Sequence, residues 1–223
     1  MDVREALFSL QDLSYKAFHT RLMPTVEKET VIGVRTPDVR RLARSLSPQD
    51  TAVFLDSLPH DYYEENNVHA CLIANCKDFD TAIALTERFL PYINNWATCD
   101  MFFPKVFQKN RDALLPYIRK WICDEREFTM RFAIGLLMRL FLEDRFSTEY
   151  LSLVAEVPQE HYYVYMMVAW YFAEALIKQY DATIVYFTEH RLVRRTHNKA
   201  IQKAVESFRI PLKTKTYLRT LRR

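Results

Sequence analysis

An aromatic side chain and a carboxylate lie one helical turn apart in the stretch NNWATCDMFFP. Trp96 and Asp100 occupy positions i and i+4, so a helix through this stretch presents them on one face. Asn94 or Asn95 supplies a helix cap, and Pro104 has no N–H to bond the carbonyl of Asp100. The helix is therefore expected to bend or stop beside the acid. The pair is either a core tryptophan next to a surface or capping acid, or the floor of a site.

Arginines at helical spacing mark a second candidate, in EFTMRFAIGLLMRLF. Arg131, Gly135 and Arg139 recur at four-residue steps and form one stripe of the predicted helix. A glycine inside a helix costs roughly 1 kcal/mol relative to alanine. Two arginines beside bare backbone suit the close approach of a phosphodiester strand. The alternative is an exposed helix face that carries two arginines.

A third candidate is the tryptophan of YYVYMMVAWYFAEALIKQY, a helix that is apolar nearly all round. Such a helix is buried, or else one aromatic face lines a cleft. Met166, Trp170 and Glu174 follow one line along it, and the simplest role for Trp170 is in the core. The sequence leaves both roles open.

Composition excludes several other kinds of site. Two glycines in 223 residues argue against a β-rich fold, a Rossmann fold and a phosphate loop. The six histidines and four cysteines show no metal-ligand spacing, so we expect no metal, no cofactor and reduced thiols. No apolar run is long enough to span a bilayer and no signal peptide is visible, so we expect a cytoplasmic protein, nucleoid-associated if bacterial.

Positive charge is concentrated at the C-terminal end. Residues 191–223 hold eleven basic side chains and one acid, whereas the rest of the chain holds 20 basic and 27 acidic side chains. A segment of charge +10 on a body of charge −7 indicates a polyanionic partner. The basic residues of this segment are Arg191, Arg194, Arg195, Lys199, Lys203, Arg209, Lys213, Lys215, Arg219, Arg222 and Arg223.

Helical periodicity runs through almost the whole chain. Residues 2–20 carry apolar side chains at steps of three and four, TPDVRRLARSL has Thr36 as its expected cap, and SPQDTAVFLDSL has Ser47. The remaining helices are predicted at 61–76, 79–91, 95–109, 111–123, 126–142, 147–156, 160–179, 181–190, 195–208 and 211–221. About a dozen helices with short links favour one α-solenoid domain of HEAT type over residues 1–223. The alternative is an irregular helical bundle.

Taken together, these motifs resemble the DNA alkylation repair proteins, the AlkD-like HEAT-repeat DNA glycosylases. The resemblance rests on GVRTPDVRRLAR, the W-x-x-x-D of Trp96 and Asp100, TMRFAIG, VAWYFAEA and HNKAIQKAVESFRI, in this order. It implies a C-shaped solenoid that holds duplex DNA in a basic concave channel and excises N3- or N7-alkylated purines without conventional base flipping. By this resemblance Asp100 is the catalytic carboxylate, Trp96 and Trp170 line the cleft, and Arg131 holds a backbone phosphate.

The DNA contacts expected beyond those four residues are basic. Arg139 and, in the C-terminal segment, Arg194, Arg195, Lys199 and Lys203 are predicted to bind DNA. RTPDVRRLAR is expected to form the opposite lip of the channel. The expected state is a monomer, and the expected partner is double-stranded DNA that contains alkylated purines.

An alkylated purine is already cationic, so it leaves without a general acid. One carboxylate then stabilises the charge that moves onto the sugar and orients the attacking water. Two other functions stay open: a helical-repeat protein that binds distorted or branched DNA without excising a base, and a protein–protein scaffold.

Overall fold

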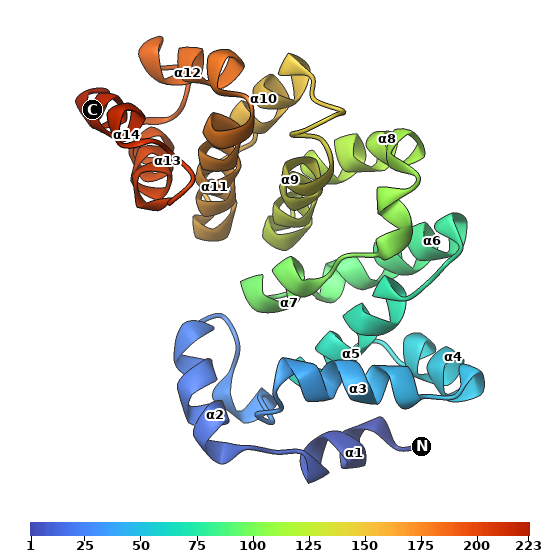
Figure 1. The fold of residues 1–223 in the computed structure, drawn as a ribbon. Coiled ribbons are helices and arrows are strands. Elements are labelled where there is room, and N and C mark those ends of the chain that lie inside the picture. The colour runs from blue at the N-terminus through green and yellow to red at the C-terminus, as the bar shows by residue number, and fades with distance from the viewer. The chain divides into compact units, whose positions relative to one another are not determined.

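The computed structural model describes all residues, 1–223, and is entirely α-helical, as predicted. The chain forms fourteen α-helices and four short 3-10 helices and no strand, and Figure 1 shows how the α-helices are arranged within each unit. The chain divides into two compact units, Met1–Leu114 and Leu115–Arg223. Helices packed in sequence within each unit agree with an α-solenoid of helical repeats. The single domain, its C shape and its concave channel stay predictions.

Unit 1 contains the helices α1 to α7 and the beginning of α8. Their bounds are α1 Val3–Ser9, α2 Leu13–His19, α3 Thr36–Ser45, α4 Pro48–Asp56, α5 Tyr63–Ala74, α6 Phe79–Phe89, α7 Trp96–Met101 and α8 Arg111–Ile122. The 3-10 helices are Thr20–Leu22, Lys28–Thr30, Leu90–Tyr92 and Lys105–Gln108. Unit 2 contains α9 Glu127–Leu140, α10 Thr148–Ala155, α11 Tyr162–Lys178, α12 Tyr180–Thr188, α13 Arg194–Glu206 and α14 Leu212–Thr220.

Local capping signals explain most helix starts. The Ser47 hydroxyl accepts a hydrogen bond from the Asp50 N–H, as predicted for the cap of α4. The expected cap of α3 was wrong by one residue, because Arg35 is the N-cap and Thr36 is already helical. Residues 2–20 form two helices because Asp12 caps a second one by accepting from the Tyr15 N–H.

The N-terminal helices bury less than their apolar spacing suggested. Leu13 and Phe18 of α2 are 68% and 57% exposed, and α2 contains no buried residue. The chain leaves the helix after Ser9 and starts a second one at Leu13, and only the first of the two has buried residues, Val3 and Leu7. Continuous helical periodicity over 2–20 was therefore the wrong interpretation.

Helix α5 forms the centre of unit 1. It packs against α1, α3, α4, α6 and α7, and all but its last residue is buried. Its first half is nonetheless polar, with Glu64, Glu65, Asn66 and Asn67. Buried polar groups need hydrogen-bond partners, so this helix is where long-range polar contacts concentrate.

Helix α11 has the same place in unit 2. It packs between α9 and α13 and also contacts α10 and α12 (Figure 1). Its buried side includes Tyr171 and Phe172, and Phe172 packs against Phe187 of α12. The partly exposed side of α11 retains Tyr165, Met166 and Trp170, where α13 runs alongside.

Candidate DNA-binding and catalytic surfaces

Helix α7 carries Trp96 and Asp100 as its first and fifth residues, and both side chains are half-buried. Asn95 caps it by accepting from the Thr98 N–H at 2.8 Å, which confirms one of the two predicted caps. The helix ends at Met101, so it stops beside the acid as expected from the proline. The predicted range 95–109 was too long, because Lys105–Gln108 forms a separate 3-10 helix. The acid is thus in the last turn of a six-residue helix.

A contact between two helices fixes the orientation of α7. The Thr98 hydroxyl donates to the side-chain oxygen of Asn67 on α5 at 2.8 Å, and both residues are buried. Because Thr98 and Asn67 lie in the middle of their helices, this bond holds α7 against the central helix of unit 1.

The Trp96 ring lies on a small apolar cluster of Met23, Val26, Val31 and Tyr63. Its indole N–H donates to the carbonyl of Leu22 at 2.9 Å, so both ends of the ring are held. A tryptophan that is fixed in this way and still partly exposed presents a rigid aromatic face. Trp96 therefore belongs to the edge of a core and also to a surface beside Asp100.

Glu64 supports this surface although sequence reasoning assigned it no role. Its carboxylate is fully buried and accepts backbone N–H bonds from Ile32, Gly33 and Val34 at 2.8, 2.7 and 3.1 Å. Burial raises the pKa of Glu64, and the three N–H donors act against that rise. The contact fixes the loop that leads from Val31, which is in the cluster beneath Trp96.

In unit 2, cationic side chains of α13 lie over aromatic rings of α11. The Arg195 guanidinium is 4.5 Å from the centre of the Tyr165 ring, and the Lys203 ammonium is 5.9 Å from that of Trp170. Lys199 is one turn from each of these basic residues. We call these five residues the α11–α13 surface. Cations above aromatic rings gain roughly 0.5–2 kcal/mol each, so the rings hold the charges in place.

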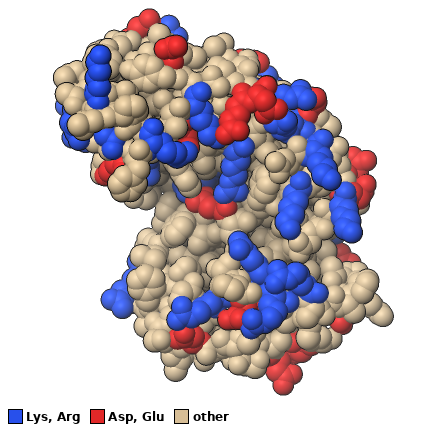
Figure 2. Space-filling view, in the orientation of Figure 1, with Lys and Arg blue, Asp and Glu red and all other residues tan.

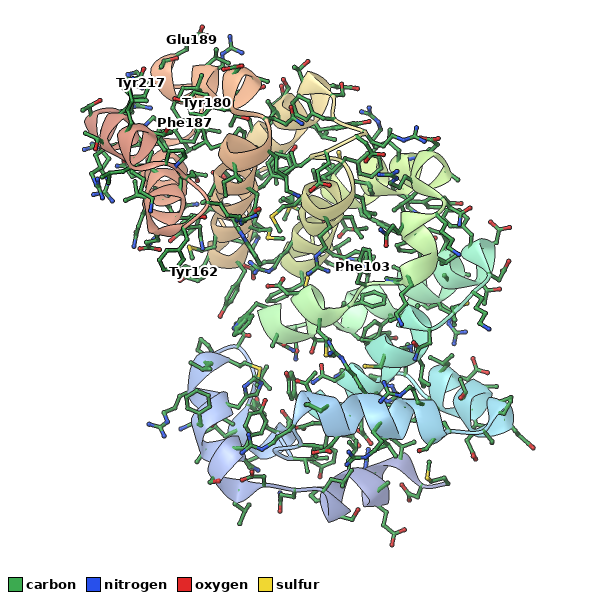
Figure 3. The ribbon with its side chains drawn as sticks, in the orientation of Figure 1. Phe103, Tyr162, Tyr180, Phe187, Glu189 and Tyr217 are labelled. Atoms are coloured by element: carbon green, nitrogen blue, oxygen red, sulfur yellow. The ribbon has the colours of Figure 1, made fainter.

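The α11–α13 surface continues into a shallow pocket of about 280 Å³. Trp170, Lys203 and Ile177 line it, together with Glu174, which forms an ion pair with Arg209. Sequence reasoning had placed Glu174 on the same line as Trp170, and the shared pocket confirms that placement. Tyr162, labelled in Figure 3, lies at the N-terminal end of α11 and is 56% exposed.

The arginine stripe of α9 is not an exposed face. Arg131 is only 6% exposed and donates to the carbonyl of Tyr163 on α11 at 2.8 Å. Gly135 is buried, and a methyl group added to it would come within 3.0 Å of the Met167 methyl. The glycine therefore permits close packing of α9 on α11, and Met167 covers the backbone that a phosphodiester strand was expected to approach at Gly135. The phosphate contact of Arg131 stays a prediction. Only Arg139 of the stripe is exposed.

The predicted site residues thus form local groups. Trp96 and Asp100 share one surface of unit 1, whereas Trp170, Arg195, Lys199 and Lys203 share one surface of unit 2. Arg194 is exposed at the first position of α13. The structure brings none of the histidines, cysteines and acids together in a group of three that would hold a metal ion. None of the helices has the length and apolarity needed to cross a membrane.

Basic side chains cover parts of both units. Figure 2 shows lysines and arginines gathered over α3 in unit 1 and over α13 in unit 2. A surface that combines fixed aromatic rings with cations suits a nucleic-acid strand, because the cations meet phosphates and the rings meet sugars or bases. The geometry of each unit therefore agrees with a nucleic-acid partner.

Comparison with known proteins supports the same interpretation. No functionally curated protein matches the chain. A family model described as "DNA alkylation repair enzyme" matches residues 3–208, which include α1 to α13 and the predicted catalytic and DNA-contacting residues from Trp96 to Lys203. The match covers most of the chain, and we conclude that this protein belongs to the family of DNA alkylation repair enzymes.

Proposed function

We propose that the protein is a monofunctional DNA glycosylase that excises cationic alkylated purines, such as 3-methyladenine and 7-methylguanine, from duplex DNA. The observation that carries the proposal is the position of Asp100, half-buried in the last turn of α7 and one turn from the fixed ring of Trp96. The family supports a role in alkylation repair.

Asp100 would act on the sugar. As the glycosidic bond breaks, positive charge develops on the deoxyribose, and a carboxylate beside it stabilises that charge and orients the attacking water. The carbonyl ends of α7 add to the effect, since the C-terminus of a helix carries partial negative charge. Pro104 has no N–H to continue the helix, which agrees with the end of α7 directly after Asp100.

The aromatic rings would provide the surroundings for this charge. Under the proposal Trp96, one helical turn from the acid, would offer a π face to a cationic sugar and help to exclude water. Under this proposal the α11–α13 surface binds the DNA strand through Arg195, Lys199 and Lys203, and Trp170 contacts the lesion nucleotide. Arg131, which is held on Tyr163, would contact a neighbouring phosphate. The protein would act as a monomer in the cytoplasm.

The test is release of free base from methylated duplex DNA, detected by mass spectrometry. At about 4 Å and an effective dielectric constant near 20, a carboxylate stabilises a full positive charge by about 4 kcal/mol. Asp100→Asn is therefore expected to lower the excision rate by as much as about a thousandfold. Asp56→Asn is the matched control, because Asp56 forms an exposed ion pair with Arg88.

Equal base release by wild type and Asp100→Asn would refute the catalytic role of the acid. DNA binding by the wild type without any release of base would favour the alternative, a repair-family protein that recognises distorted DNA but does not excise.

A further inference from the structure

Four arginines of the segment 35–44 fall into two classes. Arg35 pairs with Asp12 at 2.8 Å, and Arg41 pairs with Asp38. Arg40 and Arg44, one turn apart on α3, are exposed and form an ion pair with no carboxylate. The sequence had grouped all four as one lip of a channel, but only two have their charge uncompensated.

Arg40 and Arg44 line a pocket of about 420 Å³ that lies wholly within unit 1. Lys105, which follows α7, supplies a third cation, and no acidic side chain lines the pocket. The other lining residues are Cys71, Ala74, Asn75, Met101 and Phe103, the last of which is labelled in Figure 3 on the segment after α7. Three like charges around one hollow repel each other until an anion enters.

We propose that this pocket binds a backbone phosphate of the DNA strand next to the nucleotide at Asp100. The inference rests on the proposed function, because it takes DNA to be the substrate. Met101 forms part of the pocket wall and follows Asp100 directly in the chain. A strand whose sugar meets the acid therefore has a phosphate within reach of Arg40, Arg44 and Lys105.

The chemistry of the walls favours a phosphodiester. Two guanidinium groups offer planar pairs of N–H donors that match phosphate oxygens, and Lys105 adds a point charge. Met101 and Phe103 are half-buried apolar side chains suited to contact with deoxyribose. Cys71 is buried and lines the same pocket. The hollow is larger than one phosphate group and has room for the adjoining sugar.

The test is equilibrium binding of a labelled, undamaged duplex at several salt concentrations. One phosphate contact contributes about 0.9 to the slope of log K against log salt, or about tenfold in Kd near 0.1 M salt. The double variant Arg40→Gln/Arg44→Gln is expected to lose about one in slope and about tenfold in affinity. The control Arg35→Gln/Arg41→Gln removes the same charge from the same segment and is expected to keep the slope of the wild type.

All four arginines are exposed or partly exposed, and thermal unfolding of each variant shows whether its fold is retained. Lys105→Gln provides an independent variant outside α3, with the same direction expected. A second arm measures thermal stabilisation by inorganic phosphate at constant ionic strength. Stabilisation of the wild type by phosphate, with an unchanged DNA slope in the pocket variant, would show a site for free phosphate and overturn the proposal.

Equal slopes for the pocket variant and its control would also overturn the proposal, while base release by the wild type leaves the glycosylase function standing. Conversely, a reduced slope in the pocket variant without base release by the wild type supports the pocket and refutes the glycosylase. An absence of any DNA binding by the wild type refutes both.

Discussion

The only two glycines are predicted to respond to the same substitution in different ways. Gly33 has φ +99°, and an added Cβ would lie 2.6 Å from the Cβ of Lys16 and 2.8 Å from the backbone oxygen of Asp12. A backbone conformation of this kind costs a side-chain-bearing residue about 1–3 kcal/mol, and the overlap costs about 1–3 kcal/mol more. Gly33→Ala is therefore expected to lose about 4 kcal/mol of unfolding free energy.

Gly135 provides the matched control. Its backbone is helical, and the only close neighbour of an added Cβ is the flexible methyl end of Met167 at 3.0 Å. Alanine gains about 1 kcal/mol in a helix interior, which offsets the cost of moving that methyl group. Gly135→Ala is expected to leave stability unchanged or to raise it by up to about 1 kcal/mol, with DNA affinity unchanged.

Thermal unfolding followed by circular dichroism distinguishes the two outcomes. For a chain of this size 1 kcal/mol corresponds to about 2–4 °C in Tm, so Gly33→Ala is expected to lower Tm by about 10 °C. A wild-type Tm for Gly33→Ala would refute the conformation assigned to the loop. An equally large loss of stability for Gly135→Ala would mean that the Met167 side chain cannot move to make room for the added methyl group. Weaker DNA binding by Gly135→Ala would indicate that DNA approaches the backbone at Gly135.

Two further predictions concern buried titratable groups. A hydrogen bond of 2.9 Å joins Nε2 of His60 to Nδ1 of His69. Burial is the main cause that lowers the pKa of His69 to about 3, and the charge of His60 is the second. The unfolded chain then binds more protons below pH 6.5, so stability falls as pH falls, by about 2 kcal/mol between pH 7 and pH 5. His69→Gln should remove most of that pH dependence in urea denaturation, and an unchanged dependence would contradict the assignment. Glu64→Gln places an NH₂ group against one of the three backbone N–H donors, so we expect a loss of about 1–3 kcal/mol at pH 7. Exposed Glu5→Gln is its control, and equal stability of the two variants would show that the carboxylate does not hold the loop.

Local signals predicted the ends of α7 better than they predicted those of α2. Asn95 and Pro104 act within a few residues of the helix that they begin and end, so their effect is visible in the sequence. Asp12 also caps a helix, but the apolar residues on both sides continue a helical spacing across it. At this position the apolar spacing predicted one continuous helix, whereas the capping residue indicated the start of a second one, and the structure contains two helices.

The roles of the α9 stripe could not be read from spacing. Arg131, Gly135 and Arg139 share a spacing of four, yet two of them are buried and one is exposed. Spacing predicts which residues share a face, but which face is buried depends on the neighbouring helices. Here α11 covers the face: its Met167 lies against Gly135, and its Tyr163 carbonyl accepts a hydrogen bond from Arg131.

The position of the candidate catalytic pair depends on a chain of long-range contacts that starts at a buried acid. Glu64 holds the loop at 32–34, the adjoining Val31 packs beneath Trp96, and the carbonyl of Leu22 receives the indole N–H. Each contact joins segments at least thirty residues apart, so a local sequence pattern cannot predict it. The sequence gives one signal of these contacts, which is the run of polar residues Glu64–Asn67 in the first half of α5. All four are buried, and buried polar side chains need hydrogen-bond partners. A residue such as Glu64, remote from any DNA contact, is thus expected to affect base excision through the orientation of Trp96.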